Sequence, residues 1–220
     1  MIKIVSVALF LLSFSISAKA QYSSLNAHSH NDYDHSSPFY GVYLNHFGSI
    51  EADVWAIDGN LFVAHHRSEI KPEKIIDSLY IHPIVKTFRQ NGNKAWHNSP
   101  SAYQLLIDIK TDVEPALTLL IEKLKKFPDV FDPSVNANAI RVVISGNRPA
   151  PSGFKNYPQF IFFDGKLNTK YDGRQLERIA LFSENMKKFT IWNGRGPIPE
   201  KEETRLKQVI DSVHHINKKS

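Results

Sequence analysis

The chain has 220 residues, with 27 Lys and Arg against 22 Asp and Glu, and it contains no cysteine. With 42% hydrophobic and 22% charged residues, it has the composition of a globular domain, which excludes disordered and collagen-like chains. The absence of cysteine excludes a disulfide scaffold, a zinc-thiolate site and a cysteine nucleophile. The length predicts a single domain, at most with a small appendage.

The N-terminus has the pattern of a secretory signal peptide. A positive start and an apolar run over residues 4–16 precede an A-x-A cleavage pattern that ends at Ala20. The apolar run is shorter than the ~20 residues that a membrane span needs. We therefore expect a signal peptide over 1–20 and a secreted or periplasmic domain over 21–220 with no transmembrane segment. Loss of two lysines lowers the formal net charge from +5 to +3, which is too weak to indicate nucleic-acid binding.

Short apolar, β-rich runs alternate with longer amphipathic runs along the mature domain. In chain order the predicted strands are 24–27, 49–55, 61–64, 104–109, 140–145, 159–163 and 179–182. Several are apolar throughout, as in a parallel sheet covered by helices. Apolar residues at helical spacing predict helices over 112–127 and 200–217. This alternation predicts an α/β fold.

Polar residues gather at the ends of the predicted strands, whereas the strand starts are comparatively bland. The polar runs are 28–32, 51–53, 108–110, 145–148, 164–166 and 183–185. Polar groups in this position are typical of a site at the C-terminal edge of a (β/α) barrel or a parallel sheet. Within the fourth run, Arg148 either reads a substrate headgroup or lies in a solvated loop.

Glu51 and Asp53 alternate with apolar residues, so both carboxylates lie on one face of a predicted buried strand. Two buried like charges repel each other unless a cation or a proton lies between them. A divalent cation is the simplest solution, and oxygen ligands favour Mg²⁺ or Ca²⁺. Asp108 could add a third carboxylate, and Lys110 could neutralise the cluster or contact phosphate. The alternative is a salt-bridged structural cluster without metal.

Six of the ten histidines lie between residues 28 and 66. Either His28 or His30, together with His65, could form an acid/base pair beside the cation. One histidine would take a proton from a nucleophilic hydroxyl and the other would give one to the leaving oxygen, while the cation neutralises phosphoryl charge. A zinc site of the amidohydrolase kind is an alternative, but it needs histidines at later strand ends, and the sequence has none there.

Four motifs in this order resemble the phospholipase C-like phosphodiesterase superfamily: AHSHNDY, SIEADVWAIDG, LFVAHHRSEI and LLIDIK. That superfamily includes glycerophosphodiester phosphodiesterases and phosphatidylinositol phospholipases C. The chain looks most like a poorly characterised bacterial and fungal branch with a His-x-His-Asn-Asp-Tyr start. The resemblance implies a TIM-type (β/α) barrel, a site at the strand C-termini, one Mg²⁺ or Ca²⁺ ion and two catalytic histidines.

The resemblance also implies roles for individual residues. The metal ligands would be Glu51, Asp53 and Asp108, and the second catalytic histidine would be His65. His66 departs from the pattern, since many relatives have Asp after the second histidine.

The first catalytic histidine has two possible assignments. Alignment with glycerophosphodiesterases makes it His28, whereas alignment with eukaryotic phospholipases C makes it His30 and turns Asn31 into a metal ligand. The His-x-x-Asn-Asp spacing favours His28. We also expect Asn31 and Lys110 to contact substrate.

The strand count gives six barrel strands, with 61–64 as a hairpin extension of the second. The expected fold is therefore a TIM-type barrel that lacks its last two strands, because such barrels have eight. The expected function is a metal-dependent phosphoric diester hydrolase acting on a small-molecule or lipid-headgroup phosphodiester. The alternative is a catalytically impaired barrel that binds a phosphorylated or sugar ligand.

Overall fold

The computed structural model describes residues 23–99 and 101–217, so the predicted signal peptide lies outside the described residues. The strands are β1 (His28–Ser29), β2 (Ser49–Ile57), β3 (Asn60–Val63), β4 (Gln104–Ile109), β5 (Arg141–Gly146), β6 (Ile161–Gly165) and β7 (Ile179–Phe182). The α-helices are α1 (Tyr40–Leu44), α2 (His82–Gln90), α3 (Val113–Leu124), α4 (Pro128–Phe131), α5 (Gly173–Leu176) and α6 (Glu200–Asn217). Short 3₁₀ turns occupy Ser24–Asn26, Asp32–Asp34, Arg67–Glu69, Pro151–Asn156 and Met186–Lys188, and a π-helical turn occupies Asp77–Ile81.

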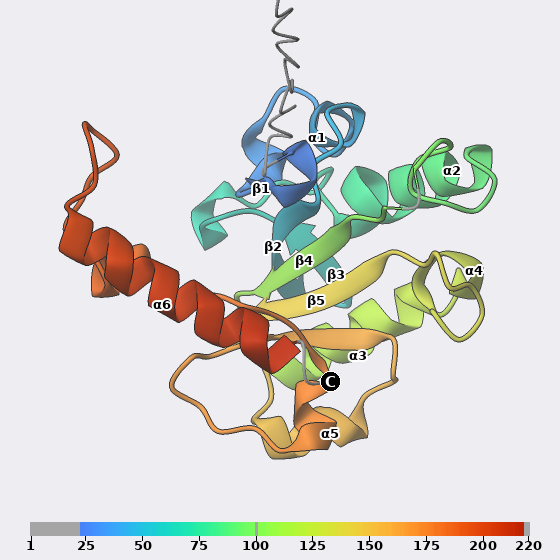
Figure 1. Cartoon of the computed structure of the whole chain (residues 1–220). Coiled ribbons are helices and arrows are strands. Elements are labelled where there is room, and N and C mark those ends of the chain that lie inside the picture. The colour runs from blue at the N-terminus through green and yellow to red at the C-terminus, as the bar shows by residue number, and fades with distance from the viewer. Residues whose placement is uncertain (1–22, 100, 218–220) are drawn as a thin grey trace, which may run out of the picture.

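Six of these strands run parallel in one curled sheet, in the order β1-β2-β4-β5-β6-β7 (Figure 1). β3 pairs antiparallel with β2 across a turn at Asp58 and Gly59. Both turn residues have positive φ, 47° and 75°, as a tight two-residue hairpin turn requires. The hairpin extension expected over 61–64 is therefore confirmed.

The predicted TIM-type (β/α) barrel is wrong, although the expected count of six parallel strands agrees with the described sheet. A TIM barrel closes eight parallel strands into a ring. In residues 23–99 and 101–217 the sheet contains six parallel strands, and β1 and β7 lie at its two ends without pairing to each other. The described fold is an open α/β sheet curled into a half-barrel.

The sheet separates an apolar face from a polar one, because side chains alternate along each strand. Aliphatic and aromatic residues from β2, β4, β5 and β6 form one core with residues of α2 and α3; they include Ile50, Val54, Leu105, Ile107, Val142, Ile144, Phe163, Phe88 and Leu117. On the alternate positions of the same strands lie Glu51, Asp53, Asp108, Ser145 and Asp164. In Figure 1, α2, α3 and α4 lie to one side of the sheet, and α6 lies apart from α2 and α4. None of the described helices has the length and apolar character needed to cross a membrane.

Local differences from the predicted elements occur near the strand ends. The predicted strand over 24–27 is a 3₁₀ turn, in which the Ser23 amide donates to Asn26 Oδ1 (3.2 Å). β6 begins and ends two residues later than predicted, so that Asp164 lies inside the strand. α3 ends at Leu124, ahead of Pro128, which begins α4.

Candidate functional site

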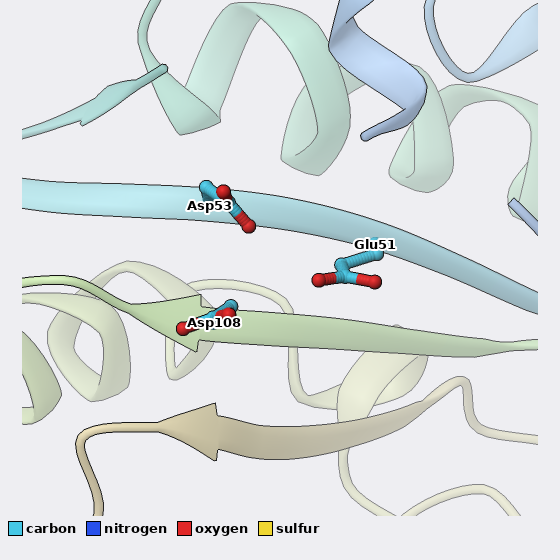
Figure 2. Close-up of side chains that lie close together, drawn as sticks. All are labelled: Glu51, Asp53 and Asp108. Carbon is cyan, nitrogen blue, oxygen red and sulfur yellow. The ribbon is translucent and has the colours of Figure 1, made fainter. Parts of the chain in front are cut away.

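Three carboxylates converge on the polar face of the sheet. Glu51 and Asp53 come from β2 and Asp108 from β4, and Asp53 and Asp108 are register partners in the parallel pair. Each offers an oxygen within 4.8 Å of the others (Figure 2). Glu51 is 6% exposed and Asp53 is fully buried. Because buried carboxylates repel one another, this arrangement needs compensating positive charge.

The two oxygens of Asp53 have different surroundings. Oδ2 accepts hydrogen bonds from His65 Nδ1 (2.9 Å) and Lys110 Nζ (3.0 Å). Oδ1 is buried and has no hydrogen-bond partner among the residues that the structure describes. An unpaired buried carboxylate oxygen is costly, and a bound cation would remove that cost. Oδ1 of Asp53 therefore fits the role of a metal ligand.

Lys110 supplies part of the compensating charge. Its ammonium also contacts Asp108 Oδ2 (2.9 Å). Burial lowers the pKa of Lys110, but the hydrogen bonds to Asp108 and Asp53 outweigh it and hold the pKa above its usual value. Burial raises the pKa of Asp108, an effect that the hydrogen bond from Lys110 opposes and the charges of Asp53 and Glu51 reinforce. One ammonium against three carboxylates leaves two formal negative charges, which suits a divalent oxygen-bound cation.

His28 and His65 each contact one of the carboxylates. His28 Nε2 lies 2.7 Å from Glu51 Oε2, and its Nδ1 lies 2.8 Å from Ser49 Oγ. His65 Nδ1 contacts Asp53, while its Nε2 has no hydrogen-bond partner among the described residues. Both histidine side chains are 41% exposed, so each is accessible to a ligand from solvent. The two histidines thus flank the carboxylates from different strand ends.

The other two predicted residues of the first strand end lie differently. His30 is exposed, and its ring centroid is 6.5 Å from that of His28. Within residues 23–99 and 101–217 it makes no hydrogen bond to the carboxylates. Asn31 has a left-handed backbone (φ 49°) and a buried Oδ1 with no hydrogen-bond partner among these residues. Of the two histidines, His28 therefore contacts the carboxylate cluster in the described residues, and His30 does not.

Tyr33 is a site residue that the sequence reasoning missed. Its side chain is buried, and its hydroxyl makes no hydrogen bond within the described part of the chain. Burial raises the pKa of Tyr33, and the neighbouring Asp53 carboxylate raises it further, so the phenol stays protonated. Its position in the same motif as His28 was the available signal, but its closeness to the Asp53 carboxylate depends on the pairing of β1 with β2.

Asp164 forms a second polar cluster along the same edge. Its Oδ2 accepts from Ser145 Oγ (3.0 Å) and Ser183 Oγ (2.5 Å), and its Oδ1 accepts from the Ser183 amide (3.0 Å). Arg148 Nη1 lies 3.7 Å from Oδ2. These residues belong to the polar strand-end runs of the sequence, but their mutual contacts join β5, β6 and β7 and were not predicted.

Sequence comparison relates the chain to fungal proteins. It is 27% identical over 165 residues to the altered inheritance of mitochondria protein 6 homolog of Arthroderma benhamiae, covering 64% of this chain and 52% of that protein. It is 28% identical over 167 residues to the altered inheritance of mitochondria protein 6 of Kluyveromyces lactis, covering 60% of this chain and 40% of that protein. It is 27% identical over 237 residues to the altered inheritance of mitochondria protein 6 of Saccharomyces cerevisiae, covering 88% of this chain and 60% of that protein.

The chain spans 40% to 60% of the length of these three relatives. No solved structure matches it. Residues 17–164, more than half of the chain, match the AIM6-like phosphodiesterase domain, and this match contains the three carboxylates and both histidines that contact them. The chain therefore belongs to the AIM6-like phosphodiesterase domain family.

Proposed function

We propose that this protein is a metal-dependent phosphoric diester hydrolase. The observation that carries the proposal is the difference between the two carboxylate oxygens of Asp53. Oδ2 accepts a hydrogen bond from His65, whereas the buried Oδ1 has no hydrogen-bond partner among the described residues. Glu51, Asp53 and Asp108 would together hold one Mg²⁺ or Ca²⁺ ion. When bound, the ion neutralises charge that develops on the phosphoryl group.

His65 is the proposed general base. A neutral histidine whose Nδ1–H donates to a carboxylate has an unprotonated Nε2, and this nitrogen can accept a proton from an attacking hydroxyl or water. The contact with Asp53 Oδ2 fixes this orientation of the ring. The same carboxylate also stabilises the imidazolium that forms after proton transfer.

His28 is the proposed general acid, in preference to His30. It lies 2.7 Å from Glu51, so a proton delivered to the leaving oxygen can come from a ring that a carboxylate orients. Both ring nitrogens of His28 are engaged, with Glu51 and with Ser49. If the Glu51 carboxylate turned to hold the cation, Nε2 would be free for the leaving oxygen, and Ser49 Oγ would keep the ring oriented through Nδ1.

We further propose kinship with the phospholipase C-like phosphodiesterases and a small-molecule or lipid-headgroup phosphodiester as substrate. The order of the four motifs and the phosphodiesterase domain match support this. Residues 1–20, outside the described residues, are proposed to direct export. Fusion of this segment to a reporter enzyme tests export: we expect the reporter outside the cytoplasm, and retention inside would reject it.

The test of the reaction uses the purified mature protein with bis(4-nitrophenyl) phosphate. We expect hydrolysis that EDTA abolishes and that Mg²⁺ or Ca²⁺ restores. His65→Ala should lower kcat by about 10²–10⁴-fold, and Glu51→Gln should raise the metal concentration needed for half-maximal rate.

His35→Ala is the matched control, because His35 is exposed and lies outside the carboxylate cluster. It should retain the wild-type rate. Hydrolysis that is insensitive to EDTA and to both site substitutions would refute the mechanism. Metal binding without any turnover would instead support a non-catalytic binding role.

A further inference from the structure

Two Asn-Gly dipeptides occur in the chain, Asn91-Gly92 and Asn193-Gly194. Asparagine before glycine is prone to spontaneous deamidation, because glycine has no Cβ atom to shield its backbone nitrogen from the preceding side chain. Whether the reaction occurs in a folded protein depends on how firmly the two reacting groups are held. The surroundings of the two dipeptides differ in this respect.

Asn91-Gly92 is held at the C-terminal end of α2. The side-chain amide of Asn91 donates to the hydroxyl of Tyr43 and to the carbonyl oxygen of Ala95 (3.0 Å). The backbone N–H of Gly92 donates to the Arg89 carbonyl oxygen (3.2 Å), so the nitrogen that would react is engaged at the helix end. These hydrogen bonds have to break before the Gly92 nitrogen can approach the Asn91 side chain. The fold therefore protects this dipeptide.

Asn193-Gly194 lies in the loop between β7 and α6. Both residues are exposed, and Gly194 has a φ of 86°. Among the described residues, Asn193 Nδ2 has no hydrogen-bond partner, and the Gly194 amide donates to no acceptor. Apart from its chain neighbours, no heavy atom lies within 4 Å of the position that a Cβ atom of residue 194 would occupy. Within the described residues, nothing therefore blocks the approach of the Gly194 nitrogen to the Asn193 side chain.

One contact of Asn193 favours the reaction. The backbone N–H of Arg195 donates to Asn193 Oδ1 (3.1 Å), which turns the side chain towards the backbone that follows it. Negative charge develops on this oxygen when a nucleophile adds to Cγ, and a donor that already points at the oxygen stabilises that charge. The Asn193 side chain is thus both oriented and polarised for attack by the next residue.

We propose that Asn193 is a site of spontaneous deamidation. The Gly194 backbone nitrogen forms a bond to Asn193 Cγ and loses its proton to solvent, while the Cγ–Nδ2 bond breaks and Nδ2 leaves as ammonia. Water then adds to one of the two carbonyl groups of the resulting succinimide ring. Opening of the ring gives either aspartate or isoaspartate, in which the chain continues through the side-chain carboxyl group. In balance, one water is consumed and one ammonia is released.

The reaction alters the loop in two ways. It replaces a neutral amide by a carboxylate and so adds one negative charge. Isoaspartate also adds a methylene group to the backbone next to Trp192, whose Nε1 donates to the carbonyl oxygens of Arg195 and Gly196 (both 3.1 Å). Because the longer backbone no longer matches these contacts, we expect isoaspartate to loosen the turn over residues 192–196.

Incubation of the purified mature protein at mildly alkaline pH tests the proposal. Digestion under acidic conditions at successive times, followed by mass spectrometry, measures the deamidated fraction of the peptides that contain Asn91 and Asn193. Without denaturant we expect Asn193 to deamidate at least about 10-fold faster than Asn91, since only Asn91 must first break its hydrogen bonds. In urea the two rates should agree within about 3-fold, because the unfolded chain no longer distinguishes the two dipeptides.

Two results of this comparison would overturn the proposal. Equal rates in the folded protein, or a faster reaction at Asn91, would show that the loop does not expose Asn193 to attack. A difference that persists unchanged in urea would come from the flanking sequence and not from the hydrogen bonds of the folded chain.

Substitutions identify the attacking group. Gly194→Ala should slow deamidation at position 193 at least about 10-fold, because the added methyl group shields the reacting nitrogen. Gly196→Ala is the matched control and should leave the rate unchanged: Gly196 also has a positive φ (65°) and open space at its Cβ position, but arginine precedes it. An unchanged rate in Gly194→Ala, with aspartate but no isoaspartate among the products, would indicate direct hydrolysis by water and reject attack by Gly194.

Discussion

The absence of a side chain at Gly146 makes room for the carboxylate of Asp108. A Cβ atom at position 146 would lie 1.8 Å from Asp108 Oδ1 and 2.7 Å from the Ile109 carbonyl oxygen. Gly146 also has a φ of 63°, a conformation that other residues adopt with strain. The position of a proposed metal ligand on β4 therefore depends on a glycine at the end of β5.

Gly146→Ala should consequently disturb both stability and metal binding. We expect a loss of about 1–3 kcal/mol in the free energy of unfolding, from the unfavourable φ and the steric overlap. We also expect weaker binding of Ca²⁺, because Asp108 must move. Urea denaturation and calorimetric titration measure the two effects.

Gly41→Ala is the matched control, because Gly41 lies in α1 and has no atom near its Cβ position. Alanine there should leave metal binding unchanged and preserve or slightly raise stability. Wild-type calcium affinity in Gly146→Ala would contradict a ligand role for Asp108.

Lys110 provides a second test of the carboxylate cluster. Its ammonium bridges Asp53 and Asp108 at 3.0 and 2.9 Å. In EDTA, Lys110→Met should cost about 1–3 kcal/mol in the free energy of unfolding, because it leaves buried carboxylates uncompensated. In saturating Ca²⁺ the loss should shrink, because without the ammonium the more negative cluster binds Ca²⁺ more tightly and gains more stability from binding.

Lys123→Met controls for the loss of an ordinary ion pair. Lys123 contacts Asp77 at 2.8 Å with a similar degree of exposure, but away from the cluster. Its stability loss should be the same in EDTA and in Ca²⁺. An equal loss in both conditions for Lys110→Met would argue that the cluster binds no cation.

The residues of the site differ in how far the sequence could place them. The i, i+2 spacing of Glu51 and Asp53 puts both on one face of β2 by a purely local rule. Their meeting with Asp108 depends on β2 and β4 being neighbours with Asp53 and Asp108 in register. The order of polar strand ends suggested this meeting, because the carboxyl ends of parallel strands share one edge of a sheet.

Whether the sheet closes into a barrel could not be predicted from the sequence in the same way. It depends on how many strands pair and on whether the first strand meets the last, which no local pattern encodes. The contacts of Asp164 with Ser145 and Ser183 were missed for a related reason, since they join three strands whose relative register comes from the whole sheet. The shift of β6 by two residues moved Asp164 from a loop into a strand.

An exposed ion pair between Arg89 and Asp129 gives a pH-dependent prediction. Arg89 donates to both carboxylate oxygens of Asp129 (2.8 and 2.9 Å), and this hydrogen bonding lowers the pKa of Asp129. A lowered carboxyl pKa stabilises the folded state above the pKa of the unfolded chain, and the stabilisation disappears as the pH falls through the folded pKa. Arg89→Met should therefore cost about 0.2–1 kcal/mol at pH 7.

The difference between this variant and the wild type should vanish at acidic pH, where Asp129 is protonated in both. High salt should also reduce it, because both side chains are exposed. Urea denaturation at pH 7 and at acidic pH measures the difference. A difference that persists unchanged at acidic pH would assign it to lost packing of Arg89 against Phe127 rather than to charge.

We expect Asp32 to stabilise the loop that follows β1. Its buried carboxylate accepts hydrogen bonds from the Phe39 amide (2.6 Å), the Tyr80 hydroxyl (3.0 Å) and Ser29 Oγ (3.3 Å). Phe39 has a φ of 62°, a conformation that needs such support in a non-glycine residue. Asp32→Ala leaves these donors without an acceptor, and we expect a loss of about 2–4 kcal/mol in the free energy of unfolding.

Asp34→Ala removes a carboxylate from the same 3₁₀ turn and serves as the control, because Asp34 is exposed. It should change stability by less than about 0.5 kcal/mol. Because the turn connects His28 to the rest of the chain, Asp32→Ala should also lower the hydrolysis rate at temperatures where the variant is still folded. Equal stability of the two variants would mean that the loop is held by the packing of Phe39 and Tyr80 rather than by the carboxylate.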